Sequence, residues 1–492
     1  MLLLACVPAQ PEVAQQGASH DTAAVETGVG DSGRDTSLAA CDELPPLPVE
    51  AGYLSGFQGS EDFAFDDDGF LVGLDTRGNI LGINQAGDQK VIVTKATRFG
   101  AGMRFLPGGD LVFADAEKGN LTRVNPSTGV LTVVLSGLSY PNGLDVGTDG
   151  LVYVSEQNAG RVRWIDPDSG EFGVVGTGFY NPNGVTFSVG YDTLYVGSFG
   201  AGVAWAIDRD GSGWAEPRVY ATTPNAPGEP PDWCATYGEG SDCPSYGGYG
   251  LGTCAEDDLG EVSCTQVYDT AACDGVELGA ACTTSRLDTP VDSVCSDGPE
   301  GVFCPSTGEA FIAACDGSEA YAACNVHGVA GTCYPTAEGV IACYDWSTYV
   351  DAMATDCIDK AEGEACVIDH EVLPGVGLCG DGSAWGLGDN VCLPGGVGFS
   401  EYGGLDGINV DACDNLYVTE YIQGKVWRFA TEGSDAEMVT KLRSSWIPNL
   451  HWGNGVGGWD TGTLYVMDRD RKGVFTLDLG VQGHGDAYQP GG

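Results

Sequence analysis

Four side chains whose oxygens could hold a hard cation recur at one phase of a repeated sequence pattern. They are Glu61, Asn142, Asn183 and Asp406. Each precedes a short apolar run, a turn and a second apolar run, and carboxylate and amide oxygens are the ligands that Ca²⁺ prefers. The sequence Pro-Asn-Gly also forms ordinary turns, so one asparagine alone would indicate little. Four oxygen donors in phase, two of them acids, predict a divalent-metal site, with calcium as the expected ion.

The repeat that carries these donors predicts the fold. Its six copies open at Glu61, Gly102, Asn142, Asn183, Asp406 and Asn449. The steps are 41, 40, 41 and 43 residues, and only the step from Asn183 to Asp406 contains a long insertion. A period of about 40–45 residues built from short strands is typical of a β-propeller blade. We therefore expect an all-β, six-bladed propeller whose symmetry brings the four donors to one end of the central channel.

The C-terminal sequence is too short to supply every strand of the last predicted blade. Little sequence follows Val474–Leu477, so we expect the outer strand of blade six to come from residues before Glu61. Pairing the two ends of the chain in one sheet would close the ring.

Sixteen of the 19 cysteines lie in the insertion, in four groups of four. Each group opens with two cysteines at the same spacing, as Cys234 and Cys243 do. Even cysteine numbers in small glycine-rich repeats are typical of disulfide frameworks made in an oxidising compartment. Zinc knuckles would need C-x₂-C pairs, which this sequence lacks. We predict short β-hairpin repeats linked by disulfides, with three connectivities open in each group.

Three cysteines lie outside the insertion. Cys6 ends the sequence LLAC, which resembles a bacterial lipobox whose cysteine is lipidated after signal cleavage. With Cys6 set aside, Cys41 and Cys413 remain, and we predict that they form a disulfide. Cys413 lies in the turn after the inner strand of blade five, at the face where the outer strand of blade six would enter. The bond would fasten the N-terminal segment to the propeller.

These patterns divide the chain into five segments. We interpret residues 1–6 as a lipobox or signal remnant, 7–40 as a flexible tether, 41–222 as blades one to four, 223–400 as the Cys-rich insertion and 401–492 as blades five and six. The tether is rich in small and polar residues without periodicity, which cannot form a core. We expect an exported protein, either an outer-membrane or cell-surface lipoprotein or a periplasmic protein.

The charge balance excludes two classes of partner. The chain has 21 Lys and Arg against 70 Asp and Glu. Nucleic-acid binding needs a basic footprint, and electrostatic adhesion to anionic lipid needs one too. Membrane attachment is therefore expected only through a lipid anchor, and we expect a monomer.

The blade motifs resemble the gluconolactonase/regucalcin family of six-bladed, metal-dependent propellers. The best match is LDGINVDACDNLYVTEYIQGKVWRF, Leu405–Phe429, beside the family block (P)DG-x-x-x-D-x-x-G-x-L-W/Y-V-A. The family's ligand set, in the order Glu, Asn, Asn and Asp, maps onto the four donors above. Its Asp, here Asp406, is also the proposed general base. The resemblance covers roughly residues 53–220 and 401–479, and it implies a metal-dependent hydrolase of a lactone or related ester.

The residues around the predicted metal site depart from the family pattern. Sugar lactonases of the family carry an Arg two residues before the blade-three Asn and an Asp after it, where this chain has Tyr140 and Gly143. We take Tyr140, Asn449 and His451 as candidate substrate-pocket residues. His451 could either face the channel or pack within a strand. The expected ligand is a small lactone or ester, or a glycan.

Two other functions fit parts of the sequence. One is a non-catalytic surface receptor, in which the metal fastens the blades and the insertion binds another surface molecule. The other is a purely structural interaction propeller, which explains the repeats but not Glu61 and Asp406 in phase with two asparagines. Fold alone does not decide between them.

The insertion is predicted to lie over the metal site. In a four-stranded antiparallel blade, the outer strand ends on the face where the next inner strand begins. The insertion starts near Tyr220, after the outer strand of blade four, and ends just before Asp406. Both of its ends should therefore lie on the ligand face, where the insertion would roof the channel. Alternatively, it swings outward as an independent stalk.

Overall fold

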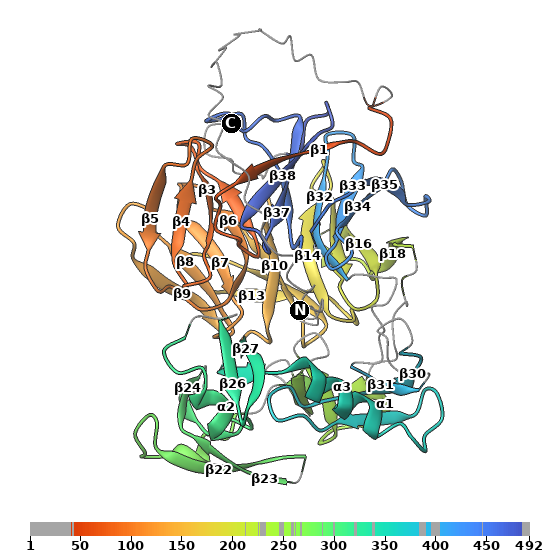
Figure 1. Cartoon of the computed structure of the whole chain (residues 1–492). Helices are drawn as coiled ribbons and strands as arrows, with labels where there is room; N and C mark the ends of the chain where they lie inside the picture. The colour runs from red at the N-terminus through yellow and green to blue at the C-terminus, as the bar shows by residue number, and fades with distance from the viewer. Residues whose placement is uncertain are drawn as a thin grey trace, which may run out of the picture.

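The computed structural model describes Cys41 and residues 44–484, apart from short internal gaps. The longest gaps are 227–232, 246–249, 383–389 and 395–403. The described chain is nearly all β and forms many small antiparallel sheets, as expected for a propeller (Figure 1). The predicted all-β class is confirmed. The lipobox cysteine Cys6 and the tether 7–40 lie outside the described residues.

Six sheets of the described chain correspond to the six repeat copies. The first three contain β2–β5 (Phe63–Phe65, Leu71–Leu74, Ile80–Ile83, Gln89–Val93), β6–β9 (Gly100–Phe105, Leu111–Asp115, Asn120–Val124, Leu131–Ser136) and β10–β13 (Pro141–Val146, Val152–Glu156, Arg161–Ile165, Phe172–Thr177). The next two contain β14–β18 (Pro182–Phe187, Thr193–Ser198, Val203–Asp210, Gly213–Trp214, Arg218–Thr222) and β32–β35 (Leu405–Val410, Leu416–Glu420, Lys425–Phe429, Glu437–Lys441). The first, second, third and fifth sheets run in chain order from the first strand outward, whereas β17 and β18 both pair with β16 in the fourth.

The sixth sheet joins the two ends of the described chain, as the sequence predicted. It contains β36–β38 (Leu450–Trp452, Thr463–Asp468, Gly473–Asp478) and β1 (Ala51–Ser55). β1 is the outer strand of this sheet and pairs antiparallel with β38 along its whole length. The disulfide between Cys41 and Cys413 also forms, and it ties the segment before β1 to the fifth sheet.

Aspartates hold the turns between first and second strands. Asp411 Oδ1 accepts hydrogen bonds from the backbone nitrogens of Cys413 (2.8 Å) and Asn415 (3.0 Å), and Asp66 makes the same two bonds in the first sheet. Such Asx turns reverse the chain within a few residues. They explain why an acid and a glycine or asparagine recur between the apolar runs.

Glycines let the first strands of neighbouring sheets approach closely. A Cβ atom on Gly143 would lie 2.2 Å from the carbonyl oxygen of Asn183, and one on Gly184 would lie 2.4 Å from that of Asp406. Both distances are far shorter than real Cβ contacts, so these positions need glycine. The first strands β10, β14 and β32 therefore lie side by side, each with its predicted donor beside this glycine.

Strand pairing corrects the phase of two repeat copies by one residue. Pro141 pairs with Glu156 and Leu144 with Val154, and a bulge between them carries Asn142. Counting residues from the corresponding paired positions in the second and sixth sheets shows that Ala101 and Pro448 are the equivalents of Asn142. The starts set at Gly102 and Asn449 were each one residue late, because spacing alone cannot fix register. The two sheets without a predicted donor carry an apolar side chain at this position.

The insertion falls between β18 and β32 and consists of short strands and helices. Its strands are β19–β21 (Asp242–Ser245, Gly250–Glu256, Val262–Thr265), β22–β25 (Ala281–Arg286, Thr289–Val294, Ser296–Gly298, Gly301–Phe303), β26–β28 (Ala323–Val326, Val329–Pro335, Ile341–Tyr344) and β29–β31 (Ala365–Ile368, Gly375–Gly380, Val391–Pro394). Its helices are α1 (Trp233–Tyr237), α2 (Glu309–Ala313) and α3 (Trp346–Thr355), with a 3₁₀ turn at Ala271–Cys273. Asp345 caps α3 by accepting from Thr348 N.

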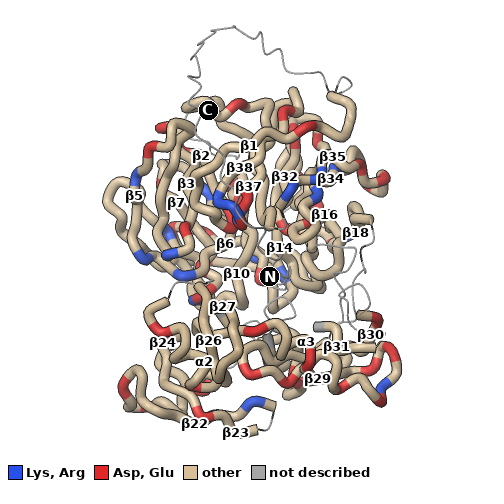
Figure 2. Tube along the Cα trace, viewed as in Figure 1, with Lys and Arg blue, Asp and Glu red and all other residues tan. Residues whose placement is uncertain are grey.

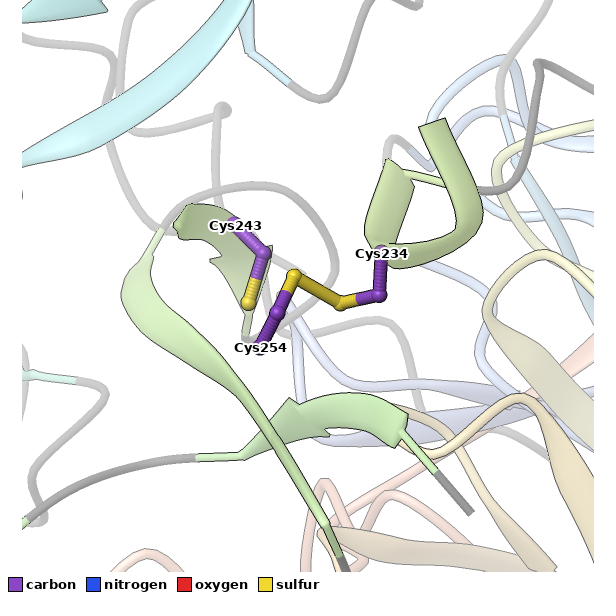
Figure 3. A group of neighbouring side chains, drawn as sticks. All are labelled: Cys234, Cys243 and Cys254. Carbon is purple, nitrogen blue, oxygen red and sulfur yellow. A yellow bond between two sulfur atoms is a disulfide. The ribbon is translucent and has the colours of Figure 1, made fainter. Parts of the chain in front are cut away.

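Disulfides follow one rule in all four cysteine groups: the first cysteine bonds the third and the second bonds the fourth. The pairs are 234–254, 243–264, 273–295, 282–304, 315–333, 324–343, 357–379 and 366–392. Figure 3 shows the bond between Cys234 and Cys254, with Cys243 beside it. Although these sulfurs cluster as metal ligands would, they are bonded to one another, so the structure supports the disulfide interpretation.

The insertion packs against the sheets through aromatic side chains. One buried cluster contains Phe99, Tyr140 and Tyr421 from the sheets together with Tyr344 and Tyr349 from the insertion. In Figure 1 the insertion, coloured green to cyan, lies along one end of the sheets. Among the described residues, no helix is long and apolar enough to cross a membrane.

Candidate metal-binding site

The four predicted donors lie at the starts of four first strands. Glu61 stands two residues before β2, and the other three lie within β10, β14 and β32. All are buried, with exposed fractions of 5% for Glu61, 3% for Asn142, 5% for Asn183 and 2% for Asp406. Buried carboxylates and amides need partners, because water is not available to them.

The two carboxyl groups lie close enough to influence each other. Burial raises the pKa of Glu61, although the charge of Arg469 counteracts this effect. Burial also raises the pKa of Asp406 well above its usual range, and the neighbouring charge of Glu61 raises it further. Two acids that disfavour each other's ionisation form a site that a cation would stabilise.

One oxygen of each carboxyl group lacks a hydrogen-bond partner among the described residues. These atoms are Glu61 Oε1 and Asp406 Oδ2. On the amide side, Asn142 Nδ2 donates to Gln157 Oε1 at 2.9 Å, which leaves Asn142 Oδ1 as the oxygen available to another partner. Two unpaired carboxylate oxygens with amide oxygens on adjacent strands fit the donor set of a calcium-class ion.

Tyr140 lies beside these donors, two residues before Asn142. Its φ of 55° is uncommon for a residue with a side chain, and such strain is often found at functional sites. The ring is buried and stacks on Phe99, with 6.1 Å between ring centroids. The backbone oxygen of Tyr140 accepts from Gln157 N at 3.0 Å. Gln157 therefore holds both Asn142 and the segment before it.

Asn449 and His451, the other candidate pocket residues, both have side chains that interact with other groups of the protein. Asn449 Oδ1 accepts from the backbone nitrogen of Leu450 at 2.9 Å. His451 is 3% exposed. Its Nε2 lies 2.7 Å from Asp62 Oδ1, and its Nδ1 lies 3.0 Å from Asn409 Nδ2. Both ring nitrogens are thus engaged between neighbouring first strands.

His451 belongs to a buried polar belt that sequence reasoning missed. Arg104 Nη1 donates to Asp62 Oδ2 at 2.8 Å, and Arg104 Nε lies 3.5 Å from Asp145 Oδ1. Burial alone would raise the pKa of Asp62, but Arg104 and His451 together lower it. The belt members Arg104, Asp145, Asn409 and His451 share one register position on their first strands. That shared phase is the signal that could have found them.

Arg469 is a second missed residue, and it touches the predicted ligands directly. Its Nη1 donates to Glu61 Oε2. Strand pairing makes Asp468 the equivalent of Glu156, so Arg469 occupies the position of Gln157, directly after the second strand of its sheet. The position that follows the second strand thus supplies one contact to Asn142 and another to Glu61.

Comparison with known proteins finds solved structures that are distantly similar to this chain. No protein-family model and no curated protein matches it. Similar solved structures include a protein assigned as a gluconolactonase (12% identity, 89% of this chain and 95% of that chain, TM-score 0.43). They also include a gluconolactonase from Xanthomonas campestris (21%, 45% and 84%, 0.32) and virginiamycin B lyase from Staphylococcus aureus (11%, 87% and 99%, 0.37). At these identities, no residue role can be transferred, so function must be argued from the site.

Proposed function

We propose that this chain is a six-bladed propeller that binds a calcium-class cation at Glu61, Asn142, Asn183 and Asp406 and hydrolyses a lactone or related ester. The observation that carries the proposal is the pair of unpaired, buried oxygens, Glu61 Oε1 and Asp406 Oδ2. Leaving them without a partner would cost free energy that a bound cation recovers.

The residues around the cation would have different roles in hydrolysis. A bound divalent cation would polarise the carbonyl of the ester and ease the ionisation of water. Asp406 would accept the proton of the attacking water. Direct ligation of the cation would lower the basicity of this carboxylate, so Asp406 would have to shift or act through a water molecule to serve as the base. Glu61, whose Oε2 accepts a hydrogen bond from Arg469, would serve as a ligand.

The insertion would control access to this site. Tyr140 directly precedes Pro141 and Asn142, and it shares a buried cluster with Tyr344 and Tyr349 of the insertion. Membership of the same buried cluster supports an insertion that roofs the ligand end of the channel. Tyr140, in place of an arginine, favours a less hydroxylated substrate than a free sugar lactone.

A non-catalytic surface receptor is the second candidate function. The observation that favours it is the burial of insertion aromatics in the cluster that contains Tyr140, in which Tyr349 is 1% exposed. In a receptor these side chains would fill the mouth of the channel and leave less room for a substrate, and the cation would only fasten the sheets together.

Export is proposed from the disulfides. Nine of them are present in the described chain, and such bonds persist in oxidising compartments. Arg286 and Lys360 are the sole basic residues of the insertion sequence, and acidic residues dominate its charged positions in Figure 2. Lipid attachment at Cys6, and with it an outer-membrane or cell-surface location, stays a proposal.

Hydrolysis assays with a matched variant pair test the enzymatic proposal. A panel of aliphatic and aromatic lactones and esters is assayed with calcium and with chelator. The Asp406→Asn variant should lose calcium-dependent turnover, whereas Asp414→Asn, an exposed change at the turn of the same sheet, should keep it. Turnover that persists in chelator, or no turnover on any member, would favour the receptor instead.

A further inference from the structure

His370 is a buried histidine in the loop between β29 and β30, within the fourth cysteine group of the insertion. It is 5% exposed, whereas its two neighbours, Asp369 and Glu371, are exposed. Val372 and Leu373, which follow in the same loop, are buried again. The loop therefore directs its acids outward and its histidine into the interior of the insertion.

Both ring nitrogens of His370 have partners, and these partners fix its protonation state. Nδ1 accepts hydrogen bonds from the backbone nitrogens of Val372 (3.2 Å) and Leu373 (3.1 Å). Nε2 lies 3.1 Å from Thr348 Oγ1, and the Thr348 hydroxyl donates its hydrogen to Asp345 O at 3.0 Å. Nε2 must therefore carry a hydrogen and Nδ1 must not, which describes a neutral imidazole.

A protonated ring is incompatible with these hydrogen bonds. A proton on Nδ1 would face the two backbone N–H groups that now donate to this atom. Both donors would lose their acceptor in a buried position, and each loss costs free energy. The charged form of His370 therefore fits only an open loop, in which the N–H groups of Val372 and Leu373 reach water.

The groups packed around the ring also disfavour a positive charge. Tyr344 of β28 and Tyr349 of α3 pack edge-to-face against it, with 5.6 and 5.3 Å between ring centroids. Burial, aided by the charge of Arg286 on β22, lowers the pKa of His370 from 6.5 to about 4, and the charge of Asp345 counteracts part of this effect. As pH falls from 6.5 toward 4, the open loop binds a proton that the closed loop does not, so the closed loop loses stability.

The same loop connects the fourth cysteine group to other parts of the protein. Arg286, in the second group, donates from Nη1 to Glu371 Oε2 at 3.2 Å and to the backbone oxygen of Glu371 at 3.3 Å. Its Nε lies 3.5 Å from Asp369 Oδ1. On the inner side, Val372 belongs to the buried cluster that contains Tyr140 of the sheets. Opening the loop would therefore disturb both the joint between two cysteine groups and the packing of the insertion on the sheets.

We propose that His370 is an acid-sensitive switch, whose protonation opens the loop 369–374 and loosens the insertion from the sheets. At low pH, the side chains of the sheets that share the buried cluster, Tyr140 among them, would become accessible. Histidine suits this role because its ordinary titration lies just below neutral pH. The inference requires neither a bound cation nor hydrolysis, so it is independent of the proposed function.

Hydrogen–deuterium exchange of the intact, disulfide-bonded chain tests the switch. Exchange is measured at pH 7, 6 and 5 and corrected for the intrinsic pH dependence of amide exchange. In the peptide that contains Val372 and Leu373, the opening equilibrium should rise about twentyfold from pH 7 to pH 5. The rise should begin near pH 6, where ordinary carboxylates are still ionised. The peptide that contains Tyr140 should exchange faster over the same range, and β7, in the second sheet, should not.

A matched pair of variants assigns the response to one ring. In His370→Asn, the amide oxygen can accept from the same two backbone N–H groups, as in an Asx turn, but it does not titrate. The pH response of this variant should be less than about twofold. His327→Asn is the control, because His327 lies in the third cysteine group and is exposed. It should keep the full response of the unmodified protein.

Each outcome decides the inference. A response in the unmodified protein and in His327→Asn that is absent from His370→Asn supports the switch. If the loop does not open faster at pH 5, or opens equally in His370→Asn, the switch is overturned. Should His370→Asn fail to form its native disulfides, the pH profile of the unmodified protein decides, because an onset only below pH 5 would assign the response to carboxylates. A loop that opens without any change in the peptide around Tyr140 would overturn the link to the sheets.

Discussion

Glu61 and Asp406 start the first strands of two different sheets, yet their carboxyl groups are electrostatic neighbours, and each keeps one buried oxygen unpaired. Neither residue alone would indicate a metal site. Because each carboxyl group raises the free-energy cost of ionising the other, a bound cation would stabilise the charged forms of both.

This coupling predicts a pH dependence of stability. An acid whose pKa is raised in the folded state binds more protons there than in the unfolded chain. Its contribution therefore favours folding at low pH and is lost as pH rises through the raised pKa. Without calcium, the unmodified protein should lose thermal stability relative to Asp406→Asn as pH rises from about 4 to 8. Thermal melts of both proteins across this range measure the difference.

Calcium should reverse that trend. Its ligands must be deprotonated, so its affinity should rise with pH over the same window. In saturating calcium, the unmodified protein should gain melting temperature toward neutral pH, and Asp406→Asn should not. Parallel pH profiles for the two proteins with calcium would contradict the assignment of Asp406.

The polar belt predicts a large loss of stability at one arginine. Arg104→Met leaves Asp62 buried with one partner fewer, and removing one member of a buried ion pair costs about 3–5 kcal/mol. The double variant Arg104→Met, Asp62→Asn should recover part of this loss, because the uncompensated charge is gone. Arg218→Met, which breaks pairs on exposed side chains, should cost less than about 1 kcal/mol. Denaturant titrations measure all three, and equal costs at Arg104 and Arg218 would contradict the belt.

The disulfide between Cys41 and Cys413 should stabilise the junction of the chain ends. It links positions 372 residues apart in sequence, and removing a crosslink typically costs about 2–4 kcal/mol. The Cys41→Ser, Cys413→Ser variant should lose this amount in denaturant titrations. Non-reducing peptide mapping should recover the linked pair from the unmodified protein, and free thiols at both positions would refute the bond.

Deleting the insertion tests its role as a roof. A chain in which a short linker replaces residues 224–396 should still bind calcium, because all four ligands lie outside the insertion. It should lose selectivity among ligands, since the insertion aromatics that share a buried cluster with Phe99 and Tyr140 are removed. Unchanged selectivity would mean that the insertion only packs beside the site.

The sequence predicted those features that a repeat makes visible. Periodic apolar runs placed the strands, and the short end of the chain predicted β1 beside β38. Elimination among the cysteines predicted the bond from Cys41 to Cys413. All of these depend on spacing or composition, which a single sequence contains.

Features set by register and by contacts across the ring were not predicted. The one-residue shift at Gly102 and Asn449 arises because a bulge precedes the regular pairing in several first strands. Arg469 reaches Glu61 only because the first and sixth sheets are neighbours in the fold. The connectivity of the cysteine groups likewise depends on the path of the chain in space.

Calcium titration of the unmodified protein and of Asp406→Asn tests the central claim most directly. The account predicts one calcium ion per chain, bound through Glu61 and Asp406. It predicts an affinity at least about a hundredfold weaker in Asp406→Asn, which corresponds to about 2.7 kcal/mol. Asp414→Asn should bind as the unmodified protein does. Equal stoichiometry and equal affinity in Asp406→Asn and the unmodified protein would contradict the site.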